Sequence, residues 1–215
     1  MTAIRASVLA AGLLITAGAA SADVIQASQT PAFLKNINIT APSLFSTPFA
    51  VVPTATYQWT PTGETIPGFE SFCLEPNVGV ASGVVHEYST RTLTEAGYSA
   101  AQQDALAKLW SGYRAEANTI DTSAAFQIAV WEIIHDDGLD VTGGAFTVNS
   151  WGDPRDTAQT WLSAIAADTG PAPVLEFVVL HSDSVQNQIM LVPAPSAAAM
   201  IAGGLGLLGA RRRRR

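Results

Sequence analysis

The sequence predicts an α+β fold, with a strand-rich first half and a β return around a small helical subdomain. Short segments of alternating apolar and polar residues, punctuated by prolines, fill the first half. Helical patterns occupy the middle, and alternating segments come back near the end. Residues 23–191, which lie between two distinctive chain ends, have the length of one domain with a sizeable core.

Three segments of the first half have the alternation of strands. They are residues 35–40, with Ile37 and Ile39 on one face, residues 54–60, with Tyr57 and Trp59, and residues 70–75, with Phe72 and Leu74 opposite Ser71, Cys73 and Glu75. Prolines at positions 53, 61 and 67 separate the segments. Because Cys73 lies on the face opposite Phe72 and Leu74, it need not be simple core filling.

The middle of the chain predicts helices and the end predicts two closing strands. The helices are residues 99–113, 122–134 after a cap at Asp121 or Thr122, and 153–167; the strands are residues 174–181 and 188–192. The second helix is apolar almost all round, which indicates a buried helix that ends before Gly138. Gln127 in its middle is then a buried amide, which costs about 1–3 kcal/mol unless a partner satisfies it.

The N-terminus has the pattern of a signal peptide over residues 1–22. Arg5 precedes an apolar run from Ala6 to Gly18, and Ala20-Ser21-Ala22 forms a small-x-small cleavage site. The alternative is a retained membrane anchor, but the apolar run is short for a span of about 20 residues. The mature chain is expected to begin at Asp23 and to be exported.

The C-terminal tail, residues 192–215, has three parts. Val192-Pro193-Ala194-Pro195-Ser196 is followed by the uncharged residues 197–210 and by Arg211–Arg215. As a helix the uncharged part would cover about 21 Å of a hydrocarbon core of about 30 Å, which predicts a transient anchor. The five arginines favour the cytoplasmic face and anionic lipid.

This tail resembles the PEP-CTERM sorting signal, which an exosortase-type enzyme reads and processes. Ala194 stands where that family most often has Glu, so the tail is a variant of the pattern. The resemblance implies an exosortase-type partner, a temporary membrane attachment and a final place at the cell surface or in the extracellular matrix of a bacterium. The alternative is an ordinary tail anchor that stays in the membrane.

Charge and composition argue against several classes of function. Residues 23–191 hold five basic and all eighteen acidic residues, a net charge of −13, so nucleic-acid binding is not expected. One cysteine cannot build a zinc motif, and no glycine-rich phosphate loop follows a strand, so no cofactor or metal is expected. Two alternatives remain: a hydrolase built from Cys73 and His135, and a cation site in residues 135–140.

Cys73 is the only cysteine of an exported chain, and an unpaired thiol in an oxidising compartment asks for an explanation. An internal thioester between Cys73 and Gln127, formed with loss of ammonia, would explain both the lone thiol and the buried amide. The segments Phe72-Cys73-Leu74-Glu75 and Phe126-Gln127-Ile128-Ala129-Val130-Trp131 resemble the thioester domains of bacterial surface proteins. A buried free cysteine and an intermolecular disulfide are the alternatives.

The resemblance implies single-turnover covalent capture rather than enzymatic turnover. An amine or hydroxyl group on an unknown surface or matrix ligand attacks the Gln127 acyl carbon and frees the Cys73 thiol. Phe72, Phe126 and Trp131 are expected to keep the pocket dry, and Glu75 or Glu132, taken as exposed carboxylates, are candidates to accept a proton. The rival hypothesis is a non-covalent structural or matrix protein with the same fold and a free buried cysteine.

Overall fold

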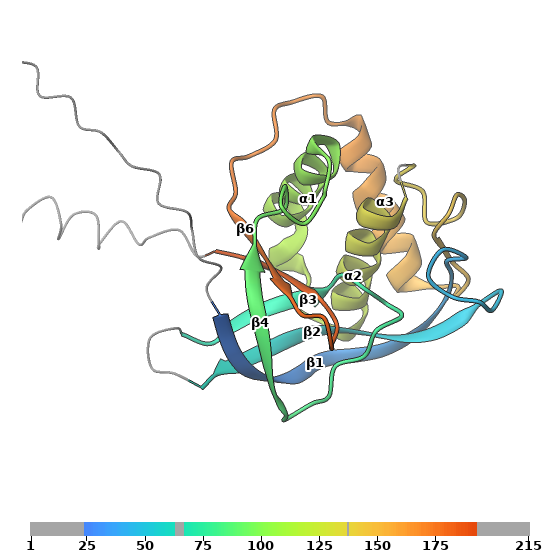
Figure 1. Ribbon diagram of the computed structural model, residues 1–215. Coiled ribbons are helices and arrows are strands. Elements are labelled where there is room, and N and C mark those ends of the chain that lie inside the picture. Colours follow the sequence, from blue (N-terminus) through green and yellow to red (C-terminus); the bar gives the residue numbers. More distant parts are fainter. Residues whose placement is uncertain (1–23, 63–66, 137, 193–215) are drawn as a thin grey trace, which may run out of the picture.

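The computed structural model describes residues 24–62, 67–136 and 138–192. In this part of the chain one antiparallel sheet of seven strands packs with three α-helices (Figure 1), so the predicted α+β class is confirmed. The strands are β1 (Val24–Thr40), β2 (Ala50–Pro61), β3 (Phe69–Cys73), β4 (Val85–Arg91), β5 (Thr147–Val148), β6 (Phe177–His181) and β7 (Gln188–Leu191). The helices are α1 (Ala100–Tyr113), α2 (Ile120–His135) and α3 (Asp153–Ala167), and a short 3-10 helix, η1 (Arg114–Glu116), follows α1.

Six of these strands close into a ring. The sheet order is β2-β3-β7-β6-β4-β1-β5, and β1 also pairs with β2, so the first and sixth strands of that order meet. Ala27 of β1 lies opposite Pro61 of β2 on one side and His86 of β4 on the other. β1 pairs with β2 along one edge and with β4 along the other, and its register with β2 shifts between Ala32 and Lys35.

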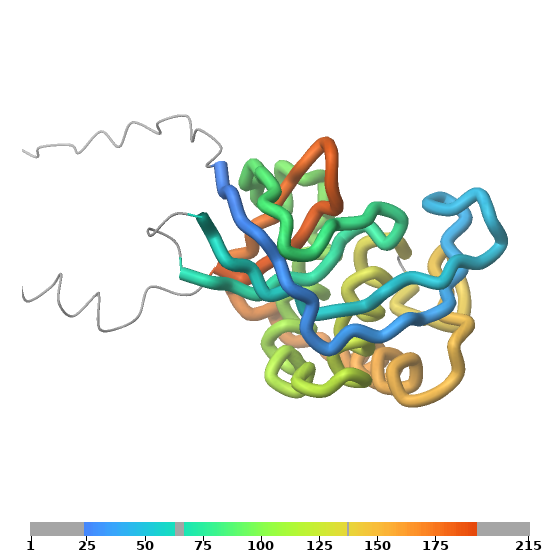
Figure 2. The backbone as a smooth tube through the Cα atoms, turned by 90° about the horizontal axis from the view of Figure 1, so that it is seen from below, coloured from blue at the N-terminus to red at the C-terminus, as the bar shows by residue number. Residues whose placement is uncertain are grey.

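The three helices lie on one side of β1 and β2 (Figure 1). In the view from below, β1 and β2 cross in front of them (Figure 2). α2 contacts β1, β2 and β3, and both α1 and α3 pack on α2. An aromatic cluster fills the space between helices and sheet: the Phe126 ring lies 4.6 Å from Phe72 and 4.9 Å from Trp110, and Trp110 lies 5.0 Å from Phe177. Such pairs add to the burial of large apolar surfaces, so α2 is fixed against β3 at this point.

Most predicted elements are confirmed, and the differences have physical reasons. The cap of α2 is Thr119, not Asp121 or Thr122, because Thr119 and Thr122 exchange hydrogen bonds in a capping box. Residues 24–34 and strands β4 and β5 were not predicted. β4 buries only Tyr88, β5 has two residues, and of the three buried residues in 24–34 only Ile25 is large and apolar, so none of these segments carries a strong apolar alternation.

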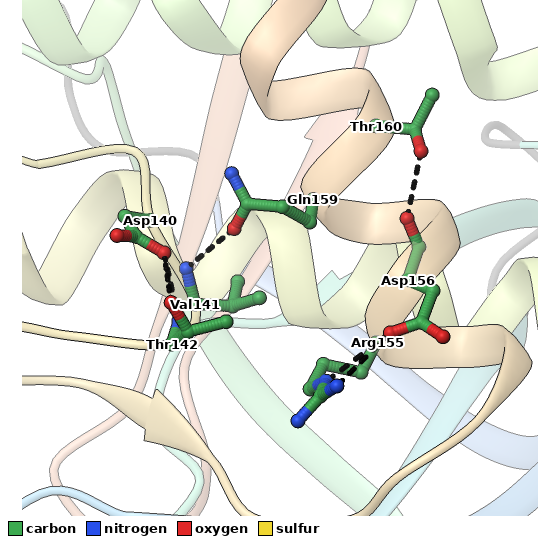
Figure 3. A network of polar contacts seen from close by, with 7 residues as sticks. All are labelled: Asp140, Val141, Thr142, Arg155, Asp156, Gln159 and Thr160. Atoms are coloured by element: carbon green, nitrogen blue, oxygen red, sulfur yellow. Dashed lines mark hydrogen bonds and ion pairs between the residues drawn. The ribbon is translucent and has the colours of Figure 1, made fainter.

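The loop that follows α2 is tied to α3 (Figure 3). The Gln159 Oε1 atom accepts a hydrogen bond from the backbone N–H of Val141 at 3.0 Å, and Asp140 Oδ1 accepts one from the Thr142 hydroxyl at 2.6 Å. On α3 itself Thr160 donates to the Asp156 carbonyl, and Arg155 pairs with the Asp156 carboxylate. Hydrogen bonds to α3 and within the loop therefore hold the loop after α2 in place.

The predicted signal peptide, residues 1–22, lies outside the described residues, as does the tail after Val192. Val192 itself donates its backbone N–H to the Glu176 carbonyl at 2.8 Å. Within the described ranges no helix has both the length and the apolar character that a membrane crossing needs.

Candidate functional site

The structure brings Cys73 and Gln127 together, although 54 positions separate them in the chain. Gln127 Oε1 accepts a hydrogen bond from the Cys73 backbone N–H at 2.8 Å, and Gln127 Nε2 donates to the Cys73 carbonyl at 2.8 Å. The backbone fixes the orientation of the amide, because an N–H requires an acceptor and a carbonyl requires a donor. Gln127 is fully buried and Cys73 is 1% exposed.

The backbone of Cys73 is available to Gln127 because β3 loses one neighbour at this residue. Leu74 donates its N–H to Asn187 on the β7 side at 3.0 Å. Since successive N–H groups of a strand point to opposite sides, the N–H and carbonyl of Cys73 point toward the β2 side. The pairing of β3 with β2 ends at Ser71, opposite Tyr57. The Gln127 amide therefore makes the two hydrogen bonds to Cys73 that a further β2 residue would have made.

α2 enters this gap because small side chains allow it close to β2. The Ser123 and Thr56 hydroxyls lie 2.7 Å apart and form a buried hydrogen bond. Ala124, Ala125 and Ala129 are fully buried on the same helix. The helix thus approaches the strand closely enough for the Gln127 side chain to reach the β3 backbone.

Both faces of β3 are buried around the site, so water is excluded from each side. Phe72 points into the aromatic cluster with Phe126, the residue that precedes Gln127. Ser71, Cys73 and Leu74 are each at most 1% exposed. The predicted pocket residues Phe72, Phe126 and Trp131 are therefore all buried close to the pair.

The thiol lies in an environment that disfavours its ionisation. Burial raises the pKa of Cys73 well above its usual value, and the Glu75 charge raises it further, whereas the Glu75 backbone N–H and the Trp131 indole oppose the rise. Burial first and then the proximity of Cys73 raise the pKa values of Tyr57 and Tyr88. Sequence reasoning missed these two phenols, because only the closure of the ring brings β2 and β4 around β3.

A chain of buried polar side chains runs through the ring beside Cys73. Trp59 Nε1 donates to Ser71 Oγ at 2.7 Å, and Ser71 Oγ donates to Gln188 Oε1 at 2.9 Å. Gln188 Nε2 then donates to Gln186 Oε1 at 2.7 Å, and Gln186 Nε2 donates to the Val78 carbonyl at 2.6 Å. This chain fixes β7 and the segment that follows β3, which together close the ring interior over the thiol.

The two candidate carboxylates differ from the expectation. Glu132 was expected to be exposed but is fully buried, because it lies beneath the loop after α2 and accepts the Asp140 N–H at 2.8 Å. Glu75 is half-buried and accepts the Asn187 N–H at 3.0 Å. Both carboxylates therefore take part in holding loops, and Glu75 is the one whose charge acts on the Cys73 thiol.

Among the residues that the structure describes, each histidine side chain has a partner other than the Cys73 thiol. His135 Nε2 lies 2.8 Å from the Leu74 carbonyl, His86 Nε2 lies 3.1 Å from the Ala81 carbonyl, and His181 pairs with Asp183. In the same ranges no three His, Cys, Asp or Glu side chains are grouped so that they could hold a metal ion.

Comparison with known proteins finds no family model, no curated protein and no solved structure that matches this chain.

Proposed function

We propose that this protein is an exported surface or matrix protein in which Cys73 and Gln127 form an internal thioester for covalent capture of a partner. The observation that carries the proposal is the pair of 2.8 Å hydrogen bonds between the Gln127 amide and the Cys73 backbone in a fully buried site. In the thioester-forming step the sulfur attacks Gln127 Cδ, the C–N bond breaks, and ammonia leaves with the thiol proton.

The Cys73 backbone N–H supplies a catalytic hydrogen bond both when the thioester forms and when a nucleophile opens it. It already donates to Gln127 Oε1 at 2.8 Å, within the range of the donors that stabilise a developing oxyanion. The negative charge that builds on Oε1 during attack at Cδ therefore meets a donor in place. The surrounding aromatic side chains exclude water, which slows hydrolysis of the thioester.

The Cys73 carbonyl favours an amine as the captured nucleophile. It accepts a hydrogen bond from Gln127 Nε2 and loses this partner when ammonia leaves. An amide formed with an incoming primary amine restores an N–H at the same position, whereas an ester formed with a hydroxyl does not. Because a buried carbonyl without a donor costs free energy, amide products are the more stable ones.

Intact mass of the purified protein tests the proposal. A wild-type chain that is one ammonia lighter than its sequence, with Cys73→Ala and Gln127→Ala at their full masses, is the expected result. Methylamine should add to the wild type alone, and methanol at the same concentration should give less adduct at equilibrium. A wild type of full mass whose thiol alkylates after unfolding would refute the thioester.

The second candidate is a non-covalent structural or matrix protein. The same geometry favours it in one respect, because the Cys73 backbone already satisfies both polar atoms of Gln127. The buried amide then needs no chemistry to explain it. The mass measurement separates the two candidates, since only the thioester form lacks an ammonia.

We also propose export and temporary membrane attachment through the tail from Val192 to Arg215. The short uncharged segment and the five arginines support this proposal. In a bacterium with an exosortase-type enzyme, the full chain should pass from the membrane fraction to the surface or matrix. A chain that ends at residue 191 should instead appear directly in the medium, and equal partitioning of the two chains would contradict the proposal.

A further inference from the structure

One buried hydrogen-bond donor beside the thiol has no conventional acceptor. Trp131 is fully buried, and its Nε1 atom makes no hydrogen bond of standard geometry. The other indole discussed above, that of Trp59, donates to Ser71 at 2.7 Å. A buried indole usually finds a partner, so a donor without one needs an explanation.

The spacing along α2 and the electrostatics of the thiol both place the Trp131 indole beside Cys73. Trp131 follows Gln127 by four residues, so both side chains leave the same face of α2. The indole makes no hydrogen bond of standard geometry, yet it opposes the rise in the Cys73 pKa that burial causes. The Phe146 ring, at 6.3 Å, packs near the indole.

The strength of this contact depends on the charge of the sulfur. A neutral thiol or thioester sulfur is a weak acceptor, whereas a thiolate accepts a strong, charge-assisted hydrogen bond. Catalytic hydrogen bonds are often long in the resting state and shorten when charge develops. A loose contact in the resting site is therefore what a donor for the thiolate would show.

We propose that Trp131 is a catalytic hydrogen-bond donor to the Cys73 sulfur and stabilises it as the thiolate leaving group when a nucleophile opens the thioester. This inference rests on the proposed function. An amine nitrogen attacks Gln127 Cδ, the C–S bond breaks, and its electron pair goes to Cys73 Sγ. The proton that the amine loses ends on the sulfur, so an amide and a free thiol result. The Trp131 N–H acts while the sulfur carries the negative charge, and Cys73, Gln127 and Trp131 are all buried away from solvent.

Trp131→Phe tests the role, with Trp161→Phe as the matched control. Both indoles are buried in the helical layer, but Trp161 stacks on Tyr113 and is not among the groups that shift the pKa of Cys73. In the full chain, mass spectrometry follows methylamine addition and spontaneous hydrolysis. Trp131→Phe should slow thioester opening by both nucleophiles about 10- to 100-fold, the effect of losing one hydrogen bond to a charged atom. Trp161→Phe should react at the wild-type rate.

The outcomes separate this inference from the proposed function. A wild type of full mass would refute both. A wild-type thioester with equal opening rates in Trp131→Phe and Trp161→Phe would refute the donor role alone. If Trp131→Phe does not fold, the indole ¹⁵N–¹H resonance of wild-type Trp131 provides the test. It should move downfield in the methylamine-opened protein titrated to the thiolate, and a resonance that stays in place would overturn the inference.

Discussion

The hydrogen bonds between Gln127 and Cys73 can be tested without any covalent chemistry. The background is Cys73→Ala, in which no thioester can form but the backbone of residue 73 is retained. Gln127→Met in this background keeps the side-chain volume and removes both hydrogen bonds. Any loss of stability then reports the two polar contacts rather than a cavity.

The magnitude follows from what the substitution leaves behind. The N–H and the carbonyl of residue 73 remain buried and have no other partner on the β2 side, because the β2–β3 ladder ends at Ser71. Each unsatisfied buried group costs about 1–3 kcal/mol, so Gln127→Met should lower the free energy of unfolding by about 2–6 kcal/mol. For a domain of this size that is a fall in Tm of roughly 5–20 °C.

Urea denaturation and a thermal scan measure this loss against a matched control. Gln58 lies exposed on β2, opposite Glu70, so Gln58→Met in the same background should change the free energy of unfolding by less than about 0.5 kcal/mol. Equal m-values would show that both variants unfold over the same surface. If Gln127→Met lowers the free energy of unfolding by less than about 1 kcal/mol, the conclusion that the Gln127 amide satisfies the backbone of residue 73 is refuted.

Three further predictions concern the crosslink, the core and pH. If the thioester closes the 54-residue separation, opening it with methylamine should lower the free energy of unfolding by about 4 kcal/mol, by the chain-entropy relation for a covalent loop; methylamine should leave Cys73→Ala unchanged. Phe126→Ala should cost about 3–5 kcal/mol in urea denaturation because its ring packs on Phe72 and Trp110, whereas the exposed Val174→Ala should be nearly neutral; similar costs for both would contradict the assigned core. Burial lowers the pKa of His135, so the unfolded chain takes up this proton at a higher pH than the folded chain. Stability is therefore complete above the ordinary histidine pKa of about 6.5 and falls as pH decreases through it, and the wild type should lose more stability than His135→Gln between about pH 7 and pH 5. Parallel profiles would contradict the burial of His135.

Part of the site was predictable because its signals are local. The apolar character of residues 122–134 predicts a buried helix, and Gln127 within it is the residue that breaks the pattern. The structure confirms the burial of Gln127 and Cys73 and places them in contact. Trp131 follows from the same helix spacing, because residues four apart share a face.

The sequence by itself determined the α+β class, the boundaries of α3 and the burial of α2, because these depend on periodicity and caps within one segment. Only the tertiary structure decided that β3 loses its β2 neighbour at Cys73, that Gln127 completes the ladder there, and that Glu132 is buried. Each of these depends on how strands far apart in the chain close into a ring, with α2 placed against its open position. Local patterns carry no information about such long-range pairing, since a strand reads the same in sequence whether its neighbour is another strand or the side chain of a helix.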